Sequence, residues 1–129
     1  MAIRRNVVAI VDDDPSVRKA MVNLLSTSGY CTELFASGGA FLDAATTCEA
    51  TCLVVDIQLG DISGVELGRQ LAASGFTFPI IFMSARDDDT VRSQATALGC
   101  VAYLRKPFPA DLLLAAIVKA VGQMPNMDP

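Results

Sequence analysis

Residues 53–60 read Leu53-Val-Val-Asp56-Ile-Gln-Leu-Gly60, an apolar run that stops at an aspartate. Runs of similar composition recur along the chain and give five candidate strands, at residues 7–11, 31–35, 52–55, 79–83 and 101–104. Four of them are almost continuous in Val, Ile, Leu and similar residues, which is typical of parallel strands covered on both faces. The run at 31–35 contains Thr32 and Glu33, so we expect it at an edge of the sheet.

Each candidate strand is followed by a segment in which apolar residues recur at helical spacing. The recurring residues are Val17, Met21, Leu24 and Leu25; Phe41, Leu42 and Ala45; Leu67, Leu71 and Ala72; Val91, Ala95 and Leu98; and Leu113, Ile117 and Val121. This alternation predicts an α/β fold, a doubly wound parallel sheet of five strands with five helices on its two faces. The expected strand order is the flavodoxin-like 2-1-3-4-5, which places function at the carboxyl ends of the strands.

Local signals mark the helix ends and the extent of the domain. Asp14 before Pro15 is the pattern of a helix N-cap with proline in the first turn, and Gly29 and Gly99 are placed to end helices. The chain after Val121 is rich in Gly, Pro and polar residues. We therefore predict one domain over residues 1–121, with residues 122–129 as a C-terminal tail or the start of a linker.

The composition narrows the class of protein. The 129 residues are 52% hydrophobic and 19% charged, enough for the core of one domain. No apolar run approaches the ~18 residues of a membrane span, and the first residues lack a signal-peptide pattern. We therefore expect a cytoplasmic protein without membrane contact. The net charge of −4 argues against direct binding of nucleic acid by these residues.

The chain has four cysteines and no histidine. The one close pair, Cys48 and Cys52, has no nearby partner ligands, which argues against a zinc site or a disulfide framework and favours buried or half-buried thiols. Without histidine, a Ser/His/Asp or Cys/His nucleophile system is excluded. Phosphoryl transfer remains possible because it depends mainly on positioning and charge.

Acidic residues follow the first and third candidate strands. Asp12 and Asp13 come directly after the first, and Asp56 comes directly after the third. The two strands are neighbours at the topological switch point of the predicted sheet, so their carboxylates should converge in one crevice. Clustered carboxylates repel one another unless a cation compensates them, and an all-oxygen cluster open to water suits Mg²⁺. Asp14 is assigned to the N-cap, which leaves Asp12 and Asp13 for the metal.

A hydroxyl and an ammonium group follow the last two strands. Ser84 follows the fourth candidate strand and Lys106 follows the fifth. Each alone is weak evidence of a site. Together with the acids they supply what an aspartyl phosphate needs: a nucleophile, a metal, a hydroxyl donor and a fixed cation for the phosphoryl oxygens.

These motifs occur in a fixed order along the chain: Val-Asp12-Asp13, Val-Val-Asp56, Met-Ser84-Ala85, Tyr103 and Lys106-Pro107-Phe108. The set strongly resembles the CheY-like receiver domain of two-component response regulators, and within that family the FixJ-type receivers. The resemblance covers about residues 6–121, and five motifs in register make it specific. It implies the same fold and a signalling switch controlled by phosphorylation.

The resemblance also implies a role for each matching residue. Asp56 would be the phosphoacceptor, with Lys106 and Ser84 assisting phosphoryl transfer and Ser84 and Tyr103 forming the switch pair. The implied ligands of Mg²⁺ are Asp12, Asp13, Asp56 and the backbone carbonyl of Gln58. The bond before Pro107 would be cis, as proline permits.

The implied partners are a sensor histidine kinase or a phosphotransfer protein. The domain would be no enzyme beyond its own phosphorylation and dephosphorylation. Movement of Ser84 and Tyr103 would remodel the fourth helix, fifth strand and fifth helix, and we expect a dimer mate or effector to bind there. Similar members often carry a C-terminal helix-turn-helix domain, so both a stand-alone regulator and the receiver of a DNA-binding regulator fit.

One position departs from the family pattern. The family usually has proline four residues after the acceptor, where this chain has Gly60, and the greater freedom of glycine predicts a looser loop and an altered phosphate lifetime. Gln58 and Arg86, each two residues past a site residue, could orient or block the attacking water, or do neither.

Two other functions compete with the receiver. Asp12-x-Asp14 superficially fits a haloacid dehalogenase-type phosphatase, in which Asp12 would be the nucleophile and Asp56 incidental. A pseudo-receiver would bind partners without phosphorylation.

Overall fold

The computed structural model describes residues 6–123. Strands and helices alternate along the chain in this order: β1 (Val7–Val11), α1 (Pro15–Thr27), β2 (Cys31–Phe35), α2 (Gly38–Ala44), β3 (Cys52–Asp56), α3 (Gly64–Ala73), β4 (Ile80–Ser84), α4 (Asp89–Ala97), β5 (Ala102–Arg105) and α5 (Ala110–Gln123). All five predicted strands are present. The last three end one residue later than the apolar pattern predicted, so Asp56 and Ser84 are the final residues of β3 and β4.

The strands form one parallel sheet in the order β2-β1-β3-β4-β5. This confirms the predicted doubly wound fold and its strand order, and it places β2 at an edge as expected. Every residue of β3 is buried, whereas β2 has exposed positions. Three of the four near-continuous apolar runs therefore belong to the central strands β1, β3 and β4, which helices cover on both faces. The fourth run is β5, which lies at the other edge of the sheet and has partly buried and exposed residues.

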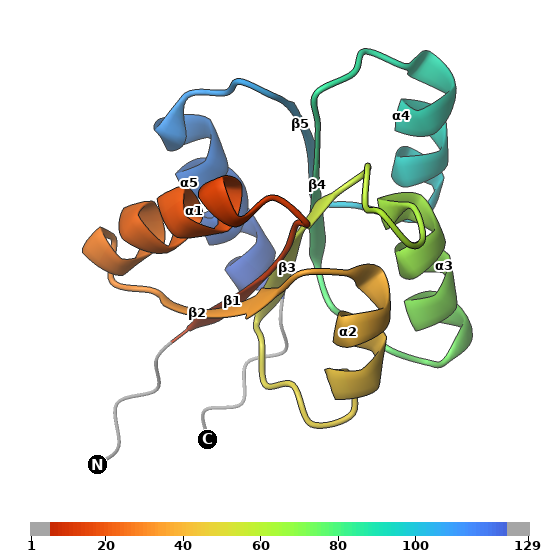
Figure 1. Cartoon of the computed structure of the whole chain (residues 1–129), viewed down its shortest axis with the longest axis horizontal. Coiled ribbons are helices and arrows are strands. Elements are labelled where there is room, and N and C mark those ends of the chain that lie inside the picture. Colours follow the sequence, from red (N-terminus) through yellow and green to blue (C-terminus); the bar gives the residue numbers. More distant parts are fainter. Residues whose placement is uncertain (1–5, 124–129) are drawn as a thin grey trace.

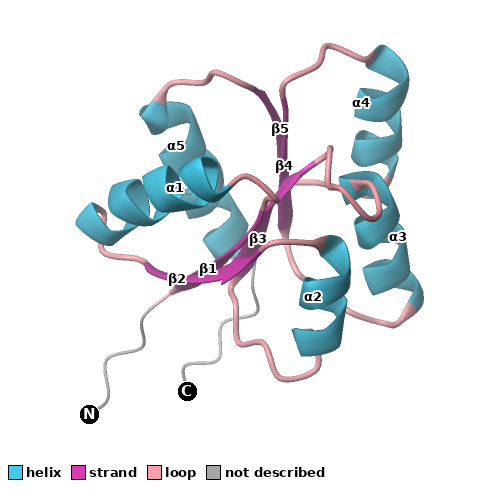
Figure 2. Cartoon of the chain, viewed as in Figure 1, coloured by secondary structure: helices cyan, strands magenta, loops and turns pink. Residues whose placement is uncertain are grey.

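Helices cover the two faces of the sheet, α1 and α5 on one side and α2, α3 and α4 on the other (Figures 1 and 2). Alternate residues of each strand point to opposite faces, and each face has its own apolar core. Val8, Ile10 and Ile117 belong to the core beneath α1 and α5. Val55 and Phe82 belong to the core beneath α2, α3 and α4, and Tyr103 packs against it.

Asp14 and Gly29 lie at the two ends of α1, as the sequence predicted. The Asp14 carboxylate accepts a hydrogen bond from the Ser16 N–H, with Pro15 at the first helical position, so Asp14 caps α1 as expected. Gly29 follows the C-cap of α1 with a φ of 89°, a conformation that glycine adopts without steric cost. At the other end of the domain, α5 continues to Gln123, two residues past the predicted boundary. The rest of the predicted tail, residues 124–129, lies outside the described residues.

Gly64 brings the start of α3 against the end of β3. A Cβ atom at this position would lie 2.5 Å from the carbonyl oxygen of Asp56, too close for any side chain. The Gly64 N–H also donates to the Ile57 carbonyl at 2.8 Å. The segment after Asp56 is therefore held close to the strand it leaves.

No helix within residues 6–123 is long and apolar enough to cross a membrane. The four cysteines are all free thiols, with Cys52 buried and Cys31, Cys48 and Cys100 partly buried. Burial raises the pKa of the Cys52 thiol to about 12, so this thiol is protonated and unreactive.

Candidate functional site

Three carboxylates meet at the carboxyl ends of β1 and β3. These strands pair directly, with Val11 opposite Val55, and the next residue in each is an aspartate. Asp12 is fully buried, Asp56 is 6% exposed, and Asp13 is exposed. One carboxylate oxygen from each of the three lies within 4.8 Å of the others. The sheet topology therefore brings together the acids that the sequence places at strand ends.

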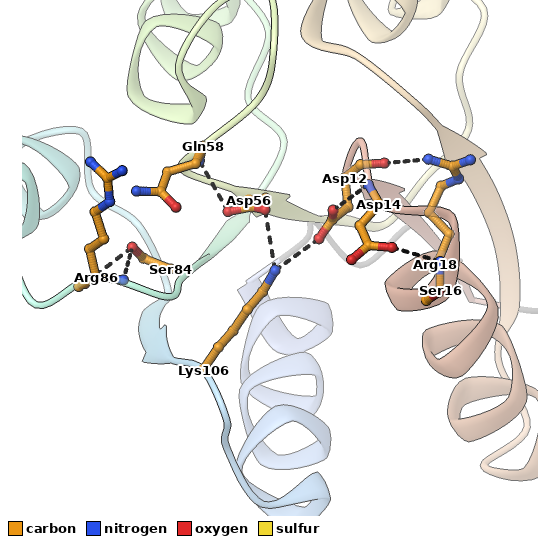
Figure 3. A network of polar contacts seen from close by, with 9 residues as sticks. All are labelled: Asp12, Asp14, Ser16, Arg18, Asp56, Gln58, Ser84, Arg86 and Lys106. Carbon is orange, nitrogen blue, oxygen red and sulfur yellow. Dashed lines mark hydrogen bonds and ion pairs between the residues drawn. The ribbon is translucent and has the colours of Figure 1, made fainter.

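The ammonium group of Lys106 lies between two of these carboxylates (Figure 3). Its Nζ donates to Oδ2 of Asp12 at 3.0 Å and to Oδ2 of Asp56 at 3.2 Å. The backbone fixes where this side chain starts, because the Lys106 N–H donates to the Ser84 carbonyl at 2.8 Å. The peptide bond that follows, Lys106–Pro107, is cis.

The environment raises the pKa of both Asp56 and Lys106. Burial raises the pKa of the Asp56 carboxyl, against the lowering effects of the Gln58 N–H and the Lys106 ammonium. Burial alone would lower the pKa of Lys106, but its hydrogen bond to Asp12 and the charges of both carboxylates outweigh this and raise it. Lys106 is therefore a fixed cation. Lys106 pairs with Asp12 and Asp56, and Asp13 lies in the same cluster of acids, so one ammonium leaves an excess of negative charge.

The donor set fits a hard divalent cation. Carboxylate oxygens are the ligands that Mg²⁺ takes in proteins, with water completing its coordination shell. The clustered oxygens of Asp12, Asp13 and Asp56 provide such ligands, and the exposed Asp13 opens the group to water. A divalent cation here would also offset the repulsion that one ammonium leaves uncompensated.

Hydrogen bonds fix the orientation of the two buried carboxylates. Oδ1 of Asp12 accepts from the Asp14 N–H at 2.9 Å, and Oδ1 of Asp56 accepts from the Gln58 N–H at 3.0 Å. In each residue Oδ2 accepts from Lys106. Both oxygens of the Asp56 carboxylate are therefore held in place.

The Ser84 hydroxyl is turned to the following loop. Ser84 is 1% exposed, and its Oγ accepts from the Arg86 N–H at 3.1 Å while donating to the Arg86 carbonyl at 3.2 Å. Among the described residues it makes no hydrogen bond to Asp56. Ser84 is thus at the edge of the site, with its hydroxyl engaged in a local turn.

Beside Ser84, a groove of about 440 Å³ runs between the loops that follow β3 and β4. Its walls include Gln58, Ser84, Arg86 and Tyr103, so these four residues, which the sequence placed near Asp56, share one surface. The hydroxyl of Tyr103 is buried and has no hydrogen-bond partner among residues 6–123.

Two residues near the site make contacts that were not predicted from the sequence. Arg18 in α1 donates from Nη1 to the backbone carbonyl of Asp12 at 2.7 Å, which fixes the turn that holds Asp12. Asp61, in the loop after β3, accepts from the N–H groups of Gly38 and Gly39 at 3.2 and 2.8 Å. The only signal for Arg18 is its place in the first turns of α1, and nothing local indicates the partners of Asp61.

Comparisons with known proteins show the family of the chain. The family model for the response regulator receiver domain matches residues 8–118. The response regulator protein TodT of Pseudomonas putida is 34% identical over 126 residues, which is 98% of this chain and 56% of TodT. The transcriptional regulatory protein FixJ of Azorhizobium caulinodans is 34% identical over 116 residues, 90% of this chain and 55% of that protein. The chain spans about half the length of the curated relatives it matches.

Solved structures give the same result. The crystal structure of FixJ-N matches with a TM-score of 0.89 and 30% identity, over 97% of this chain and all of that one. Full-length FixJ from B. japonicum matches with a TM-score of 0.87 and 33% identity, over 94% of this chain and 60% of that chain. On its motifs, its fold and these matches, the chain belongs to the response regulator receiver domain family of two-component systems.

Proposed function

We propose that Asp56 accepts a phosphoryl group from a sensor histidine kinase or a phosphotransfer protein, in a Mg²⁺-dependent reaction in the cytoplasm. The observation that carries this proposal is the position of Lys106, whose ammonium contacts both Asp12 and Asp56 within an acidic cluster. A buried carboxylate beside a fixed cation and a group of oxygen ligands is the arrangement that phosphoryl transfer to a carboxylate requires.

In the transfer, an oxygen of the Asp56 carboxylate attacks the phosphorus atom of the donor. The new bond is O–P, and the bond that breaks joins phosphorus to the donor's histidine nitrogen, which keeps the electron pair. The Gln58 N–H and Lys106 hold the nucleophile in one orientation, which lowers the entropy cost of the reaction. Lys106 also offers its charge to the phosphoryl oxygens.

Mg²⁺, when bound, would neutralise charge on the phosphoryl oxygens. The residues proposed to hold it are Asp12, Asp13, Asp56 and the backbone carbonyl of Gln58. The domain would act only on itself, catalysing its own phosphorylation and dephosphorylation.

The proposed switch begins at Ser84. A phosphoryl group on Asp56 would give the Ser84 hydroxyl a stronger acceptor than the Arg86 carbonyl it now contacts. Tyr103 lies on the same groove as Ser84, so we propose that its ring responds to this movement. The face formed by α4, β5 and α5 would then bind a dimer mate, an effector or an output domain.

Of the competing functions, only the pseudo-receiver remains a candidate. Membership of the receiver family does not support a haloacid dehalogenase-type phosphatase. A pseudo-receiver would share the fold and the family match, and it would differ only in failing to take up phosphate on Asp56.

The test is to incubate the chain with Mg²⁺ and acetyl phosphate and to measure intact mass, with Asp56→Asn as the matched variant. We expect one phosphoryl adduct on the wild type, dependent on Mg²⁺ and absent from Asp56→Asn. An adduct that persists in Asp56→Asn would move the nucleophile to another residue such as Asp12. A folded wild type with no adduct from either acetyl phosphate or a phosphorylated histidine kinase would support the pseudo-receiver.

A further inference from the structure

The side chain of Tyr103 combines a packed ring with an unpaired hydroxyl. The ring packs against the core beneath α2, α3 and α4. Its hydroxyl is buried and finds no hydrogen-bond partner among residues 6–123, although a buried hydroxyl normally has one. Leaving such a group unpaired disfavours this position of the ring, so other contacts must hold it there.

Arg92 in α4 supplies such a contact. The central carbon of its guanidinium lies 4.6 Å from the centroid of the Tyr103 ring, within the range of a cation–π interaction. Within residues 6–123, the Arg92 side chain makes no ion pair and no hydrogen bond of its own. Within those residues, the guanidinium of this exposed arginine is therefore held by its stacking on the Tyr103 ring.

The two residues connect α4 to the phosphorylation site through adjoining groups. Val91, the residue before Arg92, lines the same groove as Ser84, Arg86 and Tyr103. The Ser84 hydroxyl is in turn closed onto the Arg86 backbone. A change in the Tyr103 ring position therefore alters both the surface of α4 and the groove wall next to Ser84.

We propose that Arg92 is a positioning residue for Tyr103: its guanidinium holds the ring in the inward position described above, in which the hydroxyl is buried. Arg92 thereby sets the ratio of this inward position to an outward one, in which the hydroxyl would reach solvent, from which the switch starts. The inference rests on the proposed function only in treating Tyr103 as a switch residue. For an exposed cation–π pair, the expected effect on this ratio is about two- to fivefold.

The experiment observes Tyr103 directly. The chain has only two tyrosines, so a Tyr30→Phe background leaves Tyr103 as the single site for 3-fluorotyrosine and for tyrosine fluorescence. The ¹⁹F resonance and acrylamide quenching are measured without phosphodonor in four proteins: the background itself, Arg92→Gln, Arg92→Lys and Arg69→Gln. Arg69→Gln is the matched control, since it removes the same charge from an exposed helical position on α3.

In Arg92→Gln we expect the ¹⁹F resonance to move toward that of free fluorotyrosine and quenching to increase, corresponding to a two- to fivefold loss of the inward state. Arg92→Lys should lie between Arg92→Gln and the background, and Arg69→Gln should match the background. A resonance and quenching in folded Arg92→Gln identical to the background would overturn the inference. If Arg92→Gln does not fold, Arg92→Lys decides by the same comparison.

Intact mass after acetyl phosphate treatment separates this inference from the proposed function. An adduct on Asp56 with no ¹⁹F effect of Arg92→Gln would refute the positioning role and leave the phosphoacceptor in place. A ¹⁹F effect in a protein that takes up no phosphate would uphold the positioning of Tyr103 by Arg92 and refute the phosphorylation switch.

Discussion

Oδ2 of Asp61 accepts a hydrogen bond from the backbone N–H of Gly39 at 2.8 Å, joining residues 22 positions apart. Its Oδ1 accepts from Gly38 at 3.2 Å. These two hydrogen bonds connect the loop that follows Asp56 to the start of α2. The loop residue that makes them, Asp61, comes directly after Gly60. The looseness that glycine predicts at position 60 is opposed by these two hydrogen bonds.

Replacing Asp61 with Asn should weaken this connection in a pH-dependent way. The pKa of Asp61 is lowered, first by the hydrogen bond from Gly39 and then by that from Ile62. A carboxyl with a lowered folded-state pKa binds fewer protons when folded, so its contribution to stability exists above the ordinary pKa of 3.8 and is lost as the pH falls through the folded-state value. Thermal melts should show Asp61→Asn below the wild type at neutral pH, with the gap closing in acid.

Asp43→Asn is the control for this comparison, since Asp43 is an exposed aspartate of α2. A gap between Asp61→Asn and wild type that is the same at every pH would contradict a role for the charged carboxylate.

Gly60→Ala should stabilise the domain by about 0.4–1 kcal/mol, because it restricts the unfolded chain without strain in the folded one. Gly60 is not among the glycines with positive φ, and its added Cβ would lie 3.6 Å from Oδ2 of Asp13, an ordinary contact. Gly64→Ala is the matched opposite, since its Cβ would lie 2.5 Å from the Asp56 carbonyl oxygen. We expect it to destabilise by about 1–3 kcal/mol, and urea melts of both variants would test the contrast.

The fold follows closely from local patterns, with small errors where polar residues end strands. The predicted strands stopped before Asp56 in β3 and before Ser84 in β4, because an apolar pattern excludes a carboxylate and a hydroxyl. The backbone ladder continues through them, with Asp56 opposite Met83 and Ser84 opposite Arg105. Strand pairing depends on the main chain and extends past the hydrophobic run.

The sequence likewise predicts the contacts that the main chain sets and misses those that side chains and loops set. Asp12, Asp56 and Lys106 sit at or beside strand ends, so the sheet topology brings them together and the sequence predicts their meeting. The contacts of Arg18, Asp61 and Arg92 depend on side-chain rotamers and loop paths. Such contacts join distant segments and have no periodic signal, so the pattern of the sequence does not predict them.

Removing the Lys106 ammonium should slow phosphorylation by about 10²-fold, the usual cost of losing one donor to a developing negative charge. Lys106→Gln keeps most of the side-chain length but no charge next to Asp12 and Asp56. The measurement is the rate of adduct formation by intact mass at fixed Mg²⁺ and acetyl phosphate. A Lys106→Gln variant that melts like the wild type and is phosphorylated at the same rate would remove Lys106 from the proposed reaction.

Asp56→Asn should be more stable than the wild type at neutral pH when both are measured in EDTA. Burial raises the pKa of Asp56, so the folded state holds this proton more tightly than the unfolded state does. Stability therefore falls as the pH rises from the ordinary value of 3.8 through the folded-state pKa, and the charged carboxylate remains a cost above it. Asparagine avoids that cost.

Melting temperatures of Asp56→Asn and wild type should therefore separate as the pH rises and converge in acid. Adding Mg²⁺ should then raise the stability of the wild type by mass action, about 2.7 kcal/mol at a concentration one hundred times Kd. If Asp56→Asn melts below the wild type in EDTA at neutral pH, the ionised carboxylate stabilises the fold and this account of Asp56 is wrong.

Arg18→Gln tests whether the turn that holds Asp12 depends on α1. The guanidinium donates to the Asp12 carbonyl at 2.7 Å, and losing this hydrogen bond should cost about 1 kcal/mol in urea unfolding. Lys19→Gln is the control, because it makes the same change of charge at the next, exposed residue.

If Asp12 helps to hold Mg²⁺, a less fixed turn also weakens binding, so a Mg²⁺ titration followed by thermal shift should give a higher Kd for Arg18→Gln than for Lys19→Gln. Equal effects of the two variants on stability and on Mg²⁺ affinity would mean that only the lost charge matters and that the contact with Asp12 does not.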